Sequence, residues 1–224
     1  MKNKSGITRF CTLFLLVFIA AGVAAQTEQT RSLPQFLFEK FNKGIIKLKD
    51  GKTYVANMNY NLVEEEMIFD QKGTYMTLSE PQNIDTVFLN NRIFVPVEEA
   101  FYEVLSHGNI TFFMQHKARY STVGTPTAYG MTSQTNSSVR VTSVRSATQF
   151  RTIDVPDNVT VTLASQYWVR KKGSMEKFSN QRGFLKIFPE KDTELKQFCN
   201  SNKIDFKSRE DMIKLANYFS ALFK

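Results

Sequence analysis

Short runs of alternating apolar and polar residues fill the first half of the chain after its N-terminal segment. The clearest run is 54–62, where an apolar residue stands at every second position from Tyr54 to Leu62 and asparagine dominates the positions between them. A period of two puts the apolar side chains on one face of an extended chain, as a half-buried strand requires. We therefore predict an antiparallel sheet with one packed face and one face in water.

Residue pairs typical of tight turns divide the stretch 44–115 into hairpins. They are Asp50-Gly51, Lys72-Gly73, Asn90-Asn91 and Gly108-Asn109. Gly and Asn tolerate the positive φ of hairpin turns, so each pair predicts a reversal of the chain. The strands predicted between them are 45–49, 54–62, 67–69, 75–78, 84–89, 93–97, 101–105 and 110–114. Pro96 cannot donate to a ladder, which predicts that its strand lies at an edge or carries a bulge.

The composition changes at 121–138, which is dominated by Ser, Thr and Gly. A connection this long without apolar period is either a functional loop or a mobile one. Tyr129 is the aromatic residue there that could stack on a partner. Alternation returns afterwards, and further strands are predicted at 139–142, 159–163, 166–170 and 184–188. One continuous sheet accounts for both halves more economically than two domains.

The C-terminal residues 190–224 change to a helical period. Leu195, Phe198 and Cys199 predict a helix at 191–201, and Ser208 with Asp211 forms a capping-box start for a second helix. The segment 34–41 fits either a helical turn or a strand. The predicted fold class is α+β: a mainly antiparallel meander or curved sheet with a C-terminal helical pair packed on it.

Residues 1–25 have the pattern of a cleavable export signal. Lys2, Lys4 and Arg9 precede an apolar region, and small residues at 23–25 predict cleavage before Gln26. A membrane anchor is the alternative, but the apolar run is shorter than the roughly 20 residues of a bilayer span. We expect an exported protein, periplasmic or extracellular, whose mature form is a single β-rich domain (26–224) without a transmembrane span.

Charge and cysteine content limit the possible partners. The chain carries +8, and removal of residues 1–25 takes away three positive charges and leaves +5. The densest cluster, 170–172, precedes Gly173 and fits a solvated turn better than a nucleic-acid patch, so no nucleic-acid partner is expected. Cys199 would be the sole remaining cysteine, which excludes an internal disulfide.

The sequence contains no recognisable catalytic or metal-binding motif. His107 and His116 stand outside any metal-ligand spacing, and no nucleophile elbow, P-loop or dinucleotide-binding fingerprint occurs. The run 64–66 of three glutamates fits a solvated connection, because successive side chains of an extended chain point to opposite faces. We predict no catalytic, cofactor-binding or metal residues and no cofactor, and the ligand-binding residues stay unassigned. A site assembled in space from distant residues remains open.

Two parts of the chain, 59–69 and 184–190 with 204–206 and 211–215, resemble uncharacterised exported proteins of the Bacteroidetes type. Those proteins have β-rich bodies and a C-terminal helical tail. The resemblance implies a location and an architecture for this chain, and no site.

Three hypotheses on function follow. The first is a non-enzymatic protein of the cell envelope that binds or scaffolds an envelope component or an apolar or glycan ligand. Tyr167 and Trp168 lie on opposite faces of one predicted strand, so their solvent exposure would show which face of the sheet is in contact with water. The second is a carrier that holds an apolar, lipid-like ligand between the curved sheet and the helices. The third is an envelope hydrolase with a spatially assembled site, which leaves enzymatic activity uncertain, although the lack of a catalytic motif argues against it.

Overall fold

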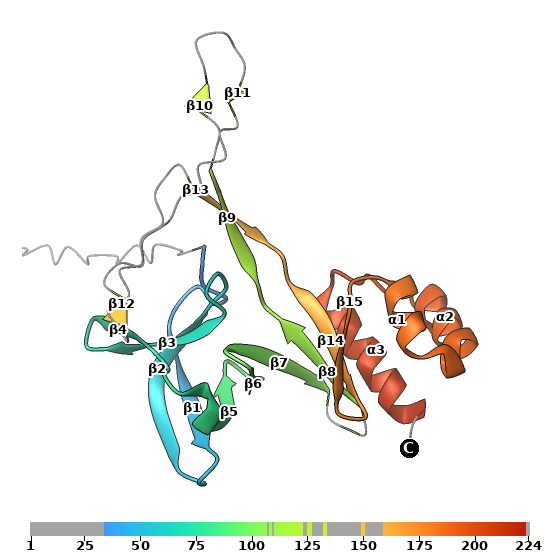
Figure 1. Cartoon of the computed structure of the whole chain (residues 1–224), viewed down its shortest axis with the longest axis horizontal. Coiled ribbons are helices and arrows are strands. Elements are labelled where there is room, and N and C mark those ends of the chain that lie inside the picture. The colour runs from blue at the N-terminus through green and yellow to red at the C-terminus, as the bar shows by residue number, and fades with distance from the viewer. Residues whose placement is uncertain are drawn as a thin grey trace, which may run out of the picture.

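The computed structural model describes residues 34–106, 108, 110–122, 125–126, 132–133, 149–150 and 159–222. Among these residues, eleven strands form one antiparallel sheet in the order β12-β4-β3-β2-β1-β5-β6-β7-β8-β14-β15 (Figure 1). The strands of the sheet are β1 Asn42–Leu48, β2 Thr53–Asn61, β3 Glu66–Gln71, β4 Thr74–Thr77, β5 Ile84–Leu89, β6 Arg92–Val97, β7 Ala100–Ser106, β8 Thr111–Gln115, β12 Gln149–Phe150, β14 Gln166–Lys171 and β15 Ser174–Phe178. The predicted class, α+β with a large antiparallel sheet and C-terminal helices, is confirmed.

The sheet contains two four-stranded meanders, β1–β4 and β5–β8, which are joined by the pairing of β1 with β5. After β4, the short 3₁₀ helix η1 (Pro81–Asn83) leads the chain back to the free edge of β1, where β5 pairs. The turns between strands use the predicted residues: Asn90 and Asn91 have φ of 50° and 59°, and Gly51 has φ of 88°. These values lie in the left-handed region that tight hairpin turns demand.

Two smaller strand pairs lie outside the large sheet. The strand β9 (Ala118–Thr122) pairs with β13 (Val159–Leu163) in a ribbon that extends away from the helices (Figure 1). The two-residue strands β10 (Thr125–Pro126) and β11 (Thr132–Ser133) pair with each other.

The C-terminal part of the chain forms the helices α1 (Gln181–Ile187), α2 (Asp192–Ser201) and α3 (Arg209–Leu222), with the 3₁₀ turn η2 (Pro189–Lys191) between the first two. The helix α3 contacts β7 and β8, and α1 contacts β15 (Figure 1). Ser208 caps the start of α3, because its Oγ accepts a hydrogen bond from the Asp211 N–H at 3.2 Å. The reciprocal bond of a capping box is not formed, since the Ser208 N–H donates to the Asp205 carbonyl and the Asp211 carboxylate accepts from the Asp205 N–H.

Aromatic rings fill the space between the helices and the sheet. Phe112 of β8, Phe184 of α1 and Phe219 of α3 contact one another at centroid distances of 5.5–5.8 Å. All three are buried, together with Phe178 and Phe188. Rings packed in this way bury large apolar areas and hold α1 and α3 on the sheet.

A second core lies among the first eight strands. Met58, Tyr60, Val87 and Phe94 are fully buried there. The Tyr60 hydroxyl lies 3.0 Å from the carbonyl oxygens of both Phe101 and His116, so this core also joins β2 to β7 and to the end of β8.

The prediction of a strand at 184–188 is wrong, because these residues lie in α1 and the turn after it. The helix begins after Asn180, whose side chain accepts a hydrogen bond from the Gly183 N–H at 2.8 Å. Phe184, Ile187 and Phe188 are the buried residues of this stretch, and their i, i+3, i+4 spacing is helical. In a short apolar run, helix and strand periods are difficult to separate.

The prediction of an edge position for Pro96 is also wrong, since β6 lies between β5 and β7. Val97 and Ala100 close a two-residue hairpin, so Pro96 and Phe101 form a non-hydrogen-bonded pair. The Pro96 nitrogen therefore points toward β5, whose pairing with β6 has already ended at Phe94. Proline is tolerated because no ladder bond is needed there.

Some predictions fall outside the described residues: the export signal 1–25, most of the loop 121–138 including Tyr129, the strand 139–142, and His107. At 34–41 the structure has turns and a bridge from Phe36 to Asn61 rather than a helix. Within the described parts of the chain, no helix combines the length and the apolar character that crossing a membrane requires.

Candidate functional site

One carboxylate stands in an otherwise apolar row of the sheet. The row crosses seven strands in register, and its members are Ile46, Val87, Phe94, Glu103, Met114, Tyr167 and Phe178. We call the face that carries this row the inner face. Glu103 has no solvent-exposed surface, although it is charged. A buried charge is costly unless it is paired and hydrogen-bonded, so its partners decide its role.

Glu103 is surrounded by three nitrogen-bearing side chains from different elements. Its Oε2 lies 2.6 Å from Nε2 of His116, just after β8, and 3.3 Å from Nη1 of Arg92 on β6. Its Oε1 accepts from Nε of Arg209 at 2.9 Å and also from Nη2 of the same guanidinium. Arg209 is the first residue of α3. We call Glu103, His116, Arg92 and Arg209 the Glu103 cluster.

The electrostatics of the Glu103 cluster favour a charged carboxylate beside a neutral imidazole. Burial raises the pKa of Glu103, but hydrogen bonds from His116 and Arg209 and the charge of Arg92 outweigh it and lower the pKa to about 2. Burial lowers the pKa of His116 below its ordinary value, opposed by Glu103. Because a carboxylate only accepts hydrogen bonds, Nε2 of the neutral His116 carries the proton.

A carboxylate hydrogen-bonded to a histidine is one part of many acid–base sites, but this pair is enclosed. Both oxygens of Glu103 already accept hydrogen bonds, and the side chain of His116 is only 4% exposed. Neither of the two grooves described below includes Glu103 or His116. The arrangement can join β6, β7, the end of β8 and the start of α3 by charge-assisted hydrogen bonds.

A second polar cluster lies nearby and includes a residue that the sequence analysis placed in water. Glu65 is buried, with φ of 61°, and its carboxylate accepts from the side chains of Gln115 and Lys117. The Gln115 Oε1 in turn accepts from the Trp168 indole N–H at 2.9 Å. The left-handed backbone turns Glu65 out of the alternation of an extended chain, which explains why the prediction of a solvated run failed here.

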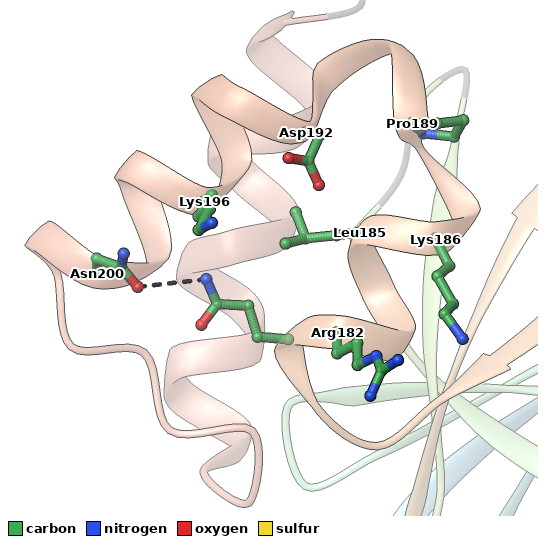
Figure 2. Close-up of a pocket in the computed structure, with 8 residues that line it drawn as sticks. Arg182, Leu185, Lys186, Pro189, Asp192, Lys196 and Asn200 are labelled. Carbon is green, nitrogen blue, oxygen red and sulfur yellow. Dashed lines mark hydrogen bonds between the residues drawn. The ribbon is translucent and has the colours of Figure 1, made fainter.

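The helices form a groove of about 740 Å³ between α1 and α2. Figure 2 shows Leu185 pointing across it toward α2, and a hydrogen bond of 3.3 Å between Gln181 and Asn200 spans one end. The charged ends of Arg182 and Lys186 point away from α2 in this view. Arg182 and Lys186 therefore do not converge on a point within the groove.

An apolar row is exposed on the opposite face of the sheet, which we call the outer face. Val55 of β2, Ile45 of β1 and Phe88 of β5 lie opposite one another in register, and Ile93 of β6 follows. The first three are 68%, 46% and 41% exposed, and Ile93 is half-buried. With about 4.8 Å between strands, the row is roughly 15 Å long. We call these four residues the outer row.

A groove of about 600 Å³ adjoins the outer row at the β5–β6 turn. Its apolar wall consists of Ile45, Phe88, Leu89 and Ile93. Its polar members are Asn42, Lys43, Asn90, Asn91 and Arg92. The two asparagines of the turn have left-handed backbones, so the hairpin that makes this wall depends on residues that the sequence analysis identified only as a turn.

The structure places the residues named from the sequence as follows. Tyr167 is buried on the inner face, whereas Trp168 is half-buried on the other face and contacts the ring of Tyr102. Cys199 is buried and its thiol pKa is raised to about 11 by burial, which disfavours the reactive thiolate. In the parts of the chain that are described, no three His, Cys, Asp or Glu residues gather as metal ligands.

Glu103 was not singled out from the sequence, and His116 was noted only as lying outside any metal spacing. The available signal was the alternation of Phe101, Glu103 and Leu105, which puts a carboxylate at a core position. Its partner Arg209 lies 106 residues away in sequence.

Comparisons with protein-family models, with curated proteins and with solved structures found no match.

Proposed function

We propose that this chain is a non-enzymatic binding or scaffolding protein of the cell envelope, and that it binds its partner with the outer row. The observation that carries the proposal is the exposure of Val55, Ile45 and Phe88 side by side on the outer face. Isolated exposed apolar residues are ordinary, but contiguous ones mark interaction sites.

The Glu103 cluster gives little support to the hydrolase alternative. A general base needs a reacting proton within about 2.6–3.2 Å of it, or one water away. Glu103 is enclosed by its own partners, and they satisfy both of its oxygens. Neither groove is lined by Glu103 or His116, and the contacts of Glu103 with Arg92 on β6 and Arg209 on α3 favour a role in holding α3 on the sheet.

The carrier alternative also receives little support from the space between helices and sheet. Phe112, Phe184 and Phe219 contact one another there, and Phe178 contacts Phe184 at 5.0 Å. A lipid-like ligand needs an apolar cavity, and rings at van der Waals contact occupy the volume that it would take.

The location in the envelope rests on the signal pattern of residues 1–25. The N-terminal sequence of the protein recovered outside the cytoplasm tests this part. We expect it to begin at Gln26, and a protein that keeps Met1 would contradict export by cleavage.

Site-specific photocrosslinking in cells that naturally make the protein tests the binding role. A photoreactive side chain at position 55 is expected to give an adduct of defined mass. Leu163, which is 69% exposed on β13, is the matched control position and is expected to give none. The adduct should disappear in an Ile45→Ser/Phe88→Ser background. Equal adducts from both positions, no adduct from position 55, or an adduct that survives these substitutions would overturn the proposal.

A further inference from the structure

Lysines flank the outer row on the same face of β1. Lys43 and Lys47 lie two positions before and after Ile45, and all three side chains are exposed because alternate residues share a face. Lys49 follows just after the strand. The exposed face of this strand thus alternates positive charge with an apolar side chain.

Two carboxylates near the outer row offset the charge of these three lysines only in part. Asp70 lies in register with Lys43 across Asn57, and Asp85 lies beside Lys47. Asp85 binds Lys47 at 3.1 Å, and hydrogen bonds from Lys47 and Thr86 together with the charge of Lys49 lower the pKa of Asp85. Among the described residues, no ion pair engages Lys43. This part of the surface therefore keeps an excess of positive charge beside its apolar residues.

The groove next to the outer row provides apolar side chains and amide groups that a partner could contact. Its volume of about 600 Å³ lies within the roughly 300–1,000 Å³ of binding pockets. Ile45, Phe88 and Ile93 can pack against an apolar side chain of a partner. The amides of Asn90 and Asn91 can donate to and accept from a partner backbone.

From this charge complementarity, we propose that the outer row and its groove bind an acidic segment of a partner protein, in which carboxylates alternate with apolar side chains. The inference rests on the proposed function, because it names the partner of the same surface. The apolar side chains would pack on the outer row and in the groove. One carboxylate would bind Lys43, and another would share Lys47 with Asp85.

Two other occupants fit the surface less well. A second copy of this chain would bring its own lysines against Lys43 and Lys47 in a two-fold arrangement, and like charges at an interface are unfavourable. An anionic membrane would attract the lysines, but the outer row lies on central strands of the sheet rather than at a projecting tip. A groove beside the row suits the side chains of a protein segment.

Titration of the isotope-labelled mature protein with synthetic peptides tests the inference by NMR. One eight-residue peptide alternates Glu or Asp with Phe, Leu or Ile, and its matched control has Gln at every acidic position. We expect the acidic peptide to bind at least tenfold more tightly, with amide shift changes confined to β1, β2, β5 and β6. Lys43→Gln/Lys47→Gln should remove this preference. Lys186→Gln/Lys196→Gln, which removes two exposed lysines beside the α1–α2 groove, should keep it.

The failures of this inference and of the proposed function are distinguishable. Equal binding of both peptides on the outer row, or no binding of either while position 55 still gives its crosslink, overturns the acidic partner and leaves the binding role intact. Cosedimentation with phosphatidylglycerol vesicles that Lys43→Gln/Lys47→Gln abolishes would assign the surface to lipid and overturn the inference. A dimer in analytical ultracentrifugation that Ile45→Ser dissolves would assign it to a second copy, with the same consequence.

Discussion

Two rows of side chains cross β1, β5 and β6 one residue apart, on opposite faces of the sheet, and they differ in how far their members are exposed. The inner row contains Ile46, Val87, Phe94 and Glu103, and all of them are buried. The outer row contains Val55, Ile45, Phe88 and Ile93; the first three are 68%, 46% and 41% exposed, and Ile93 is half-buried. The inner row therefore holds a buried carboxylate among apolar side chains, and the outer row holds exposed apolar side chains.

The difference separates residues that maintain the fold from residues that are free to bind. The buried carboxylate of Glu103 is stabilised by hydrogen bonds from Arg92, Arg209 and His116. Removing it would take this buried partner away from the two guanidiniums. The outer row has no comparable cover from the described residues. Its exposure contributes little to folding, and a partner that covered it would gain the apolar burial.

The largest effect is expected from Glu103→Gln. The substitution removes the carboxylate that both guanidiniums bind, so the free energy of unfolding measured in urea should fall by about 3–5 kcal/mol. Glu210→Gln is the matched control, because Glu210 also lies near Arg209 but is exposed, and it should change stability by at most about 1 kcal/mol. Equal losses for the two variants would contradict a special role for the buried carboxylate.

Acid is expected to destabilise the protein in two steps. The pKa of His116 is lowered in the fold, so the unfolded chain takes up that proton first, and stability falls as pH drops below about 6.5 by up to about 1.4 kcal/mol per unit. The pKa of Glu103 is also lowered, to about 2, so its contribution is complete above about 4.5 and is lost as pH falls toward 2.

Urea unfolding at several pH values between 7.5 and 5 measures the first step. In the His116→Gln variant the free energy of unfolding should vary less with pH in this range, whatever the stability of the variant at pH 7.5. A wild-type stability that does not change between pH 7.5 and 5 would contradict the buried, neutral histidine.

A smaller loss of stability is expected from Tyr60→Phe. The hydroxyl lies 3.0 Å from two buried carbonyl oxygens, and its removal leaves them without this donor, which costs about 1–3 kcal/mol. Tyr54→Phe is the control, since Tyr54 is 52% exposed at the end of the same strand, and it should leave the denaturant midpoint unchanged. A midpoint that Tyr60→Phe leaves in place would show that the hydroxyl does not join β2 to β7.

Much of the fold followed from local pattern. The alternation in β2, the Asn90-Asn91 reversal and the Ser208 cap are local signals, and each correctly predicted its element. The order of the strands in the sheet could not be predicted from local pattern, because the pairing of β5 with the free edge of β1 joins strands that are distant in sequence. The strand assigned at 184–188 failed because a five-residue apolar run does not distinguish the two periods.

The site was harder to predict than the fold. The Glu103 cluster joins residues of β6, β7 and α3 with His116 just after β8, and its longest link spans 106 positions, so no spacing in the sequence indicates it. The outer row was equally hidden. In Ile45 and Ile46 two similar side chains are adjacent, and only the register with Val55 and Phe88 decides which of them faces water.

The most direct test of the account is the free energy of unfolding of the Ile45→Ser/Phe88→Ser variant. If the outer row serves a partner rather than the core, stability should stay within about 1 kcal/mol of the wild type, as for surface substitutions, while the crosslink from position 55 is lost. A loss of several kcal/mol would show that the chain itself covers these residues, and it would contradict the division between an inner row that maintains the fold and an outer row that binds.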